Sequence, residues 1–171
     1  MQTSSAHADR ITQLLTRLDE ATSRFTQRLE RAGARAEQAE SGWTPAQMAA
    51  HVAMVNDNFT SVIDGSAGVA TEAAADFAER PWQEVATAIP EKFEAPSRFT
   101  PPPSISAGEA VGLVRDSAAR LREALAGLSA EHGARCFTNR LVGTVTVYQA
   151  GEWAIAHIIR HNQQAKRALG D

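Results

Sequence analysis

Two histidines near the carboxyl end of the chain have the spacing of a metal-binding pair. His157 and His161 are separated by four positions in the stretch WAIAHIIRHNQQAKRALG. On a helix, side chains four residues apart lie one above the other, with Cβ atoms about 5–6 Å apart. Two imidazoles at that separation can share one metal ion, although a transition metal is held well only when a third protein ligand joins them.

His51 is the candidate for the third ligand. It lies on the shoulder of an apolar stripe in a second predicted helix, from which it can point into a helical bundle. Three imidazole nitrogens with one open position form the arrangement expected of a catalytic zinc or nickel site. The spacing leaves a second interpretation open, in which the histidines are buried residues that hydrogen-bond to the backbone or to Asn58 and Gln164.

Other kinds of catalytic site lack residues that they need. The segment between His157 and His161 has no glutamate, so the H-E-x-x-H pattern of zinc proteases is missing, and no Glu-x-x-His pair supports a di-iron centre. His7, in the first turn of the first predicted helix, and His132, in a loop beside a glycine, do not fit the triad. Cys136 has no orienting third residue or oxyanion motif, so we interpret it as a small buried residue.

The elements that must position these residues are amphipathic helices. Apolar residues recur at steps of three and four in four segments, which predicts an all-α chain folded as a four-helix bundle. Three of the segments begin with a capping box, in which a Ser or Thr is followed three residues later by Glu or Gln. The predicted helices lie near 5–32, from Thr44 through Val62, from Ser106 to before His132, and from Thr146 through Leu169. A chain of this length is expected to form a single domain over residues 1–171.

The connection between the second and third helices is long and irregular. Residues 65–105 contain two glycines and six prolines, and a short helix around Thr71 to Glu79 is compatible with the pattern. We expect Trp82 and Phe93 to attach this connection to the bundle. Residues 135–145 are expected to form a second connection with a few extended residues.

Composition narrows the class of protein. The net charge of −3 shows no basic excess, which argues against a nucleic-acid partner. A single cysteine permits no intrachain disulfide, the start of the chain is polar, and no run approaches 18 apolar residues. We therefore expect a cytoplasmic protein that does not bind a membrane.

Two stretches resemble the DinB/YfiT-like family. WTPAQMAAHVAMVNDNF is similar to the family's second helix, which typically starts Trp-[Ser/Thr]-Pro-x-[Gln/Glu] and carries a histidine further on. GTVTVYQAGEWAIAHIIRHNQQAKR is similar to its last helix, which follows a Gly-Thr-x-Thr-type turn and carries His-x-x-x-His. The resemblance implies an up-down-down-up four-helix bundle, often a homodimer, with a divalent metal, zinc or nickel, on His51, His157 and His161.

The resemblance also implies a range of functions. The family includes metal-dependent S-transferases that use a low-molecular-weight thiol (bacillithiol, mycothiol or glutathione), a mycothiol-dependent maleylpyruvate isomerase and putative hydrolases. We therefore predict a thiol S-transferase that acts on small electrophiles in detoxification or stress response. Asn58, Trp153 and Gln164 are expected to be neighbours of the substrate cavity, although the same three residues fit plain packing. A metal-dependent hydrolase, a non-catalytic small-molecule-binding or stress-response bundle, and a structural dimer remain alternatives.

Overall fold

The structure is a computed structural model that describes residues 2–91 and 94–171. It is mostly helical, as the sequence predicts. Its elements follow the order α1 (Gln2–Ala32), η1 (Gly33–Glu37), α2 (Pro45–Ile63), α3 (Trp82–Ala86), η2 (Ser97–Phe99), α4 (Ala107–Ala126), α5 (Ala130–Ala134), β1 (Cys136–Asn139), β2 (Gly143–Thr146) and α6 (Val147–Leu169).

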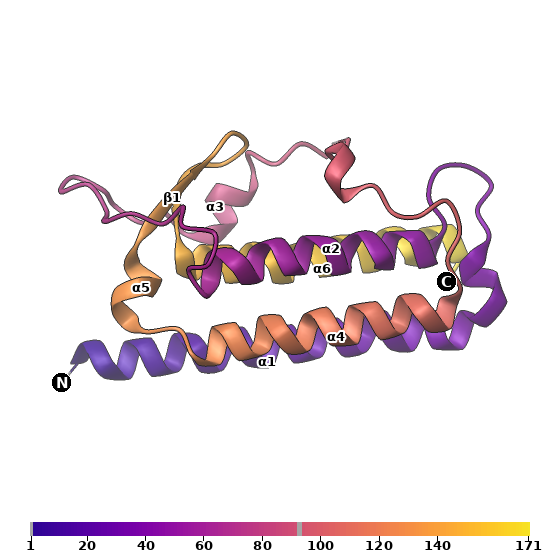
Figure 1. The fold of residues 1–171 in the computed structure, drawn as a ribbon, viewed down its shortest axis with the longest axis horizontal. Coiled ribbons are helices and arrows are strands. Elements are labelled where there is room, and N and C mark those ends of the chain that lie inside the picture. The colour runs from indigo at the N-terminus through magenta and orange to yellow at the C-terminus, as the bar shows by residue number, and fades with distance from the viewer. Residues whose placement is uncertain (1, 92–93) are drawn as a thin grey trace.

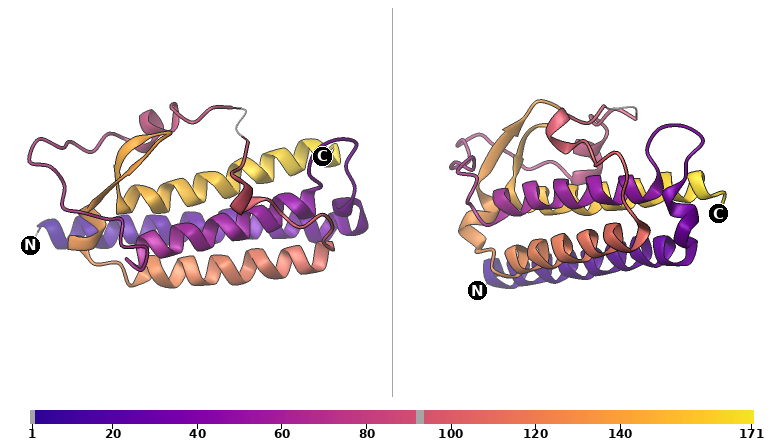
Figure 2. Two further views of the ribbon diagram at one scale, coloured as in Figure 1. Left: turned by 45° about the horizontal axis from the view of Figure 1, so that its top comes forward. Right: turned by 45° about the vertical axis from the view of Figure 1, so that its right-hand side comes forward.

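Four long helices lie side by side in two layers. Helices α1 and α4 form one layer and α2 and α6 the other (Figures 1 and 2). Each helix packs against its neighbour in the same layer and against one helix of the other layer, α1 against α6 and α2 against α4. The ribbon runs in one direction along α1 and α6 and in the opposite direction along α2 and α4. This places α2, which carries His51, in contact with α6, which carries His157 and His161.

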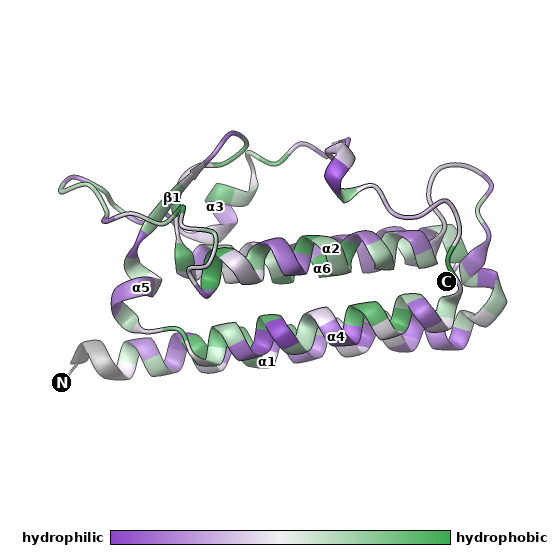
Figure 3. Cartoon of the chain, in the orientation of Figure 1, coloured by the Kyte–Doolittle hydropathy of each residue, from purple (hydrophilic) through white to green (hydrophobic). Residues whose placement is uncertain are grey.

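The core lies between the four helices. Hydrophobic and hydrophilic residues alternate along each helix, as one buried face requires (Figure 3). The largest side chains with almost no exposed surface come from all four helices, among them Phe25, Leu18, Val52, Leu121, Leu125, Ile155 and Ile158.

The starts of three long helices are fixed by the predicted capping boxes. In each box the N-cap hydroxyl accepts a hydrogen bond from the backbone N–H three residues on, and the side chain at that residue accepts one from the N-cap N–H. The pairs are Thr44 with Gln47, Ser106 with Glu109, and Thr146 with Gln149. The first helix ends at Ala32, and Gly33 follows with a positive φ of 52°, as expected for a helix stop.

The prediction of a short helix from Thr71 to Glu79 is wrong. Thr71 instead exchanges two backbone hydrogen bonds of 2.8 Å with Cys136 at the edge of the hairpin, so its peptide groups are used in extended pairing. The short helix of this connection is α3, which begins at Trp82. The predicted loop position of His132 is also wrong, because His132 lies in α5.

The connection covers the layer formed by α2 and α6 and is attached there by a second apolar cluster. Trp82, Val85, Val142 and Val145 are buried together. The last two lie in the hairpin segment, where β1 and β2 pair antiparallel with Cys136 opposite Thr146. The prediction that Trp82 attaches the connection is therefore confirmed, whereas Phe93 lies outside the described residues.

A glycine allows α5 to approach the start of α6. A Cβ atom at Gly133 would lie 2.4 Å from the Tyr148 ring, which is far closer than real carbon atoms approach. Only glycine fits against that ring.

Candidate metal centre

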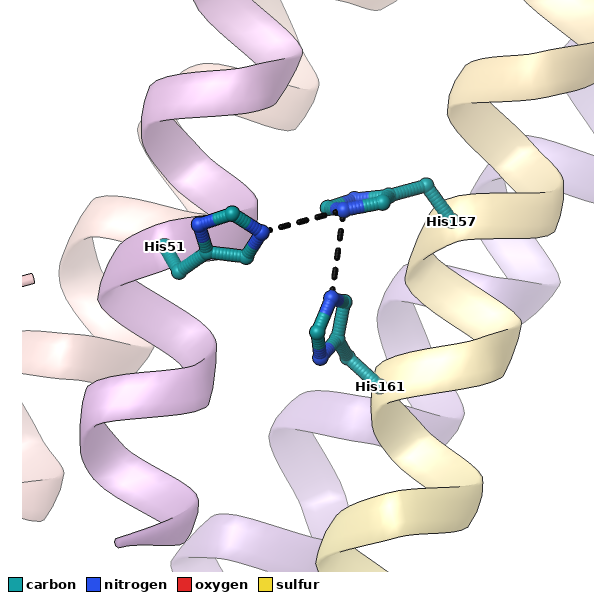
Figure 4. Close-up of side chains that lie close together, drawn as sticks. All are labelled: His51, His157 and His161. Atoms are coloured by element: carbon teal, nitrogen blue, oxygen red, sulfur yellow. Dashed lines mark hydrogen bonds between the residues drawn. The ribbon is translucent and has the colours of Figure 1, made fainter. Parts of the chain in front are cut away.

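Three histidines converge between α2 and α6. We call His51, His157 and His161 the histidine cluster (Figure 4). The Nε2 atom of His157 lies 3.2 Å from Nε2 of His51 and 3.1 Å from Nε2 of His161. All three residues were predicted from the sequence, and the structure brings all three together.

The two short contacts of His157 Nε2 fit a shared ion better than hydrogen bonds between the rings. A ring nitrogen of neutral imidazole carries either one hydrogen or one lone pair, so it cannot make two well-directed hydrogen bonds in different directions. Two nitrogens bound to one tetrahedral ion at about 2.0–2.1 Å lie about 3.3 Å apart. The observed separations are close to that value, so the donor set fits a divalent metal.

The Nδ1 atoms of the three histidines differ in their hydrogen bonding. Nδ1 of His51 donates to the carbonyl oxygen of Phe99 at 2.7 Å, which leaves Nε2 with the lone pair that a metal needs. Within the described residues, the buried Nδ1 atoms of His157 and His161 have no hydrogen-bond partner. Hydrogen bonding to the backbone is therefore seen for His51, whose partner Phe99 was not predicted, and Gln164, which the same interpretation named, lies near His161.

The electrostatic environment keeps the cluster neutral. Burial lowers the pKa of all three histidines, and charge on neighbouring histidines and on Arg160 lowers it further for His157 and His161. The pKa of His161 falls to about 3, although the nearby Gln164 side chain opposes this shift, and the pKa of His157 lies well below 6.5. Neutral imidazole is the form that binds metal ions.

The cluster borders a large cavity beneath the connection and the hairpin. The cavity has a volume of about 930 Å³ and is lined by the three histidines together with Asn58, Trp153 and Gln164. The three predicted neighbours thus line the same cavity as the histidines, and their contact with a substrate stays a prediction. Aromatic rings form much of the remaining wall, with Phe59 and Trp153 centroids 5.4 Å apart and Trp82 and Trp153 centroids 5.9 Å apart.

Several lining residues were not predicted. Arg98 and Phe99 come from η2, Arg140 from the turn between β1 and β2, and Arg160 from α6. Of these residues, only Arg160 could have been predicted from the sequence, because it lies between the two histidines on the same helix. The others lie in irregular segments, where no periodicity indicates which way a side chain points.

A second polar cluster lies where α1 packs against the start of α6. We call its members, His7, Arg10, Glu79, Tyr148 and Glu152, the Arg10 cluster. The Arg10 guanidinium lies 2.8 Å from Glu79, 3.1 Å from Glu152 and 4.4 Å from the centre of the Tyr148 ring, and His7 Nδ1 lies 2.6 Å from the Tyr148 hydroxyl. His7 therefore lies outside the histidine cluster, as predicted, and Glu152 is likewise engaged elsewhere.

Charges in the Arg10 cluster compensate one another. Burial works to lower the pKa of Arg10, but Glu79 and then Glu152 outweigh it, so the pKa is raised. Burial raises the pKa of the Glu152 carboxyl, and Arg10 opposes that shift.

Cys136 is a buried residue of β1. Burial and the charge of Glu79 raise its pKa, which lowers the fraction of reactive thiolate. This agrees with its interpretation as a packing residue.

In the described part of the chain, no helix has both the length and the apolar character needed to cross a membrane.

Comparison with known proteins agrees with the geometry of the histidine cluster. A sequence model described as the DinB superfamily matches residues 5–165, which includes all three histidines. The comparisons with curated proteins and with solved structures gave no match. Because the family model covers nearly the whole chain, the protein belongs to the DinB superfamily.

Proposed function

We propose that this protein is a metal-dependent enzyme that transfers a low-molecular-weight thiol to small electrophiles, with zinc or nickel bound by His51, His157 and His161. The single observation that carries the proposal is the convergence of three neutral imidazoles at the wall of a large cavity. A site that only stabilises the fold would be closed by a fourth protein ligand, whereas a catalytic site keeps one position open to a ligand. Membership of the DinB superfamily supports the same conclusion.

We further propose that α1, α2, α4 and α6 form an up-down-down-up four-helix bundle. The ring of contacts α1–α4–α2–α6–α1 supports this, as do the run directions in Figure 1. In such a bundle, ligands from facing helices can meet in the interior.

The chain's own residues would serve the reaction in distinct ways. When bound, the ion would lower the pKa of a coordinated thiol and so provide a thiolate at neutral pH. His51 is oriented for binding by its hydrogen bond to Phe99. Asn58 and Gln164 offer amide groups to a substrate in the cavity, and Trp153 offers a flat apolar surface that excludes water.

The charge of the lining favours thiol transfer over hydrolysis. Among the described residues, no aspartate or glutamate lines the cavity. Hydrolysis generally uses a carboxylate or histidine base to accept a proton from water, and the three histidines are assigned to the metal. A thiol whose pKa is lowered by the ion would release its proton to solvent and would need no such base.

Metal content is the first test. Protein purified without an affinity tag would be analysed by plasma mass spectrometry alongside the variants His157→Ala and His132→Ala. We expect about one equivalent of zinc or nickel in the wild type and in the control His132→Ala, and almost none in His157→Ala. If no metal is bound even after incubation with zinc and nickel, the assignment of the site is wrong.

Turnover is the second test. The metal-loaded protein would be mixed with monochlorobimane, an electrophile that becomes fluorescent on thiol transfer, and with bacillithiol, mycothiol or glutathione. We expect the wild type to turn over the electrophile with one of these thiols, and we expect the His157→Ala variant to show no turnover. Metal binding and ligand-induced thermal stabilisation without turnover would instead indicate a non-catalytic binding protein. The homodimer and the cytoplasmic location stay predictions.

A further inference from the structure

The cavity beside the histidine cluster has a one-sided charge. Its lining includes three arginines, Arg98, Arg140 and Arg160, whereas no carboxylate from the described residues lines it. The chain as a whole has more acidic than basic residues, 20 against 17. The charged residues of the cavity lining are therefore positive, although the net charge of the chain is negative.

The three arginines reach the cavity from separate elements. Arg98 belongs to η2 and places its guanidinium 4.7 Å from the centre of the Phe99 ring. Arg140 lies in the turn of the hairpin, and Arg160 lies on α6 between the two metal-site histidines. Charges of one sign that converge from three elements raise the local concentration of an anion.

None of these arginines forms an ion pair within the described residues. Arg160 donates to the carbonyl oxygens of Pro90 and Glu91, which holds the connection but leaves the guanidinium charge uncompensated. Most of the arginines on the outer faces of the long helices, such as Arg115 and Arg122, are paired with acidic residues instead. The positive charges at the cavity are therefore available to a ligand.

The rest of the cavity suits a flat apolar group. All three tryptophans of the chain, Trp43, Trp82 and Trp153, line it together with Phe59 and Phe137. The Phe59, Trp153 and Trp82 rings follow one another at centroid separations of 5.4 and 5.9 Å and are tilted by 53° and 37°, which forms a row of inclined aromatic rings. Aromatic surfaces of this kind gain most from contact with another planar ring.

We propose that this cavity binds an organic anion with a flat, apolar body. The anionic group meets Arg98 and Arg140 near the opening, and the body lies on the surface formed by Phe59, Trp153 and Trp82. The further statement that this anion is the electrophilic substrate rests on the proposed function, whereas the binding of such an anion does not. Guanidinium groups bind carboxylate and sulfonate oxygens through paired hydrogen bonds, so two exposed arginines suffice to select an anion over its neutral analogue.

A pair of fluorescent probes tests the proposal directly. 8-Anilinonaphthalene-1-sulfonate and N-phenyl-1-naphthylamine have the same ring systems, but only the first carries an anionic group. Each probe would be titrated into the metal-free protein in the presence of a chelator, so that a bound ion cannot attract the anionic probe. Quenching of tryptophan fluorescence reports the cavity, because all three tryptophans line it.

Variants identify the arginines responsible. Arg98→Gln and Arg140→Gln would be made singly and together, because both side chains are exposed and their loss should leave the fold intact. The control is the double variant Arg24→Gln/Arg31→Gln, which removes the same charge from α1, a helix that contributes no described residue to the cavity lining. Thermal unfolding by circular dichroism checks that all variants are folded.

We expect the anionic probe to bind the wild type at least about tenfold more tightly than the neutral probe. Each single variant should weaken the binding of the anionic probe about three- to fivefold, and the double variant about tenfold. Neither should change the binding of the neutral probe. Equal binding of the two probes to the wild type overturns the proposal, and so does an equal loss in the control variant. Because the protein carries no metal in this test, its result is independent of whether metal content and turnover support the proposed function.

Discussion

Helix α6 contributes to two polar clusters that differ in whether their groups have partners. In the Arg10 cluster, each charged group faces an opposite charge, and the Tyr148 hydroxyl contacts a ring nitrogen of His7. In the histidine cluster, two Nδ1 atoms have no partner in the described chain, and one Nε2 atom contacts two others. Buried polar groups are normally satisfied, so the paired groups of the Arg10 cluster indicate a structural role, whereas Nε2 atoms that face one another without an arrangement of hydrogens that satisfies them all indicate a site for an ion.

The largest expected difference between the clusters is the response to metal. Zinc or nickel at a thousand times its dissociation constant should raise the free energy of unfolding by about 4 kcal/mol, because the ion binds the folded chain only. His161→Ala should lose this response, whereas Arg10→Met should keep it. Thermal melts with metal and with chelator measure the effect. A metal-induced shift of equal size in His161→Ala would contradict the assignment.

Removal of Arg10 should have the next largest effect. Glu79 and Glu152 would then face each other without a cation, and the side chains of the three residues are only 16–33% exposed. We expect Arg10→Met to lower the free energy of unfolding by about 2–3 kcal/mol, less than for a fully buried pair because water reaches the cluster. Urea unfolding measures this loss. The matched control is Arg122→Met, whose pair with Asp19 is about half exposed and should contribute less than about 1 kcal/mol.

Acid should destabilise the metal-free protein through the histidine cluster. The unfolded chain binds protons at histidine below about pH 6.5, whereas in the folded chain the pKa of His161 is about 3 and that of His157 is also lowered. The unfolded state therefore binds more protons in this interval, so stability is lost as the pH falls from 6.5 towards 3. From pH 7 to pH 5 we expect a loss of about 2 kcal/mol from His161 alone. Urea unfolding at both pH values tests this, and a loss that persists unchanged in His161→Phe would assign it to other groups.

The smallest effect should come from replacing a histidine by an apolar ring in metal-free protein. His157→Phe removes an unpartnered Nδ1 atom and keeps much of the volume, so we expect the free energy of unfolding to change by less than about 1 kcal/mol. Chelator-treated samples unfolded in urea provide the measurement. A loss above about 3 kcal/mol would show that His157 is needed for packing, as the structural-dimer interpretation requires.

Local signals in the sequence located the helices and the residues of the histidine cluster. Capping at Thr44 and Thr146 depends on hydrogen bonds within four residues, and the pairing of His157 with His161 follows from helix geometry alone. His51 was placed by the phase of its helix, because an apolar stripe defines which direction is inward.

Features that depend on distant partners could not be predicted in the same way. Thr71 is extended because it pairs with Cys136, 65 residues away, and its own neighbours give no sign of that partner. The contact of His51 with the Phe99 carbonyl and the presence of Arg98 and Arg140 in one cavity lining depend on how two irregular segments cover the helices. Sequence periodicity describes an element, not the path of a loop over it.

The close approach of Gly133 to Tyr148 has a consequence for how this sequence can diverge. Tyr148 lies in the first turn of α6, and His157 follows about 14 Å further along the same helix. A side chain at position 133 would displace the ring and, through the rigid helix, the two histidines of the cluster that α6 carries. In related chains we therefore expect positions 133 and 148 to change together, with a bulkier residue at the first matched by a smaller one at the second.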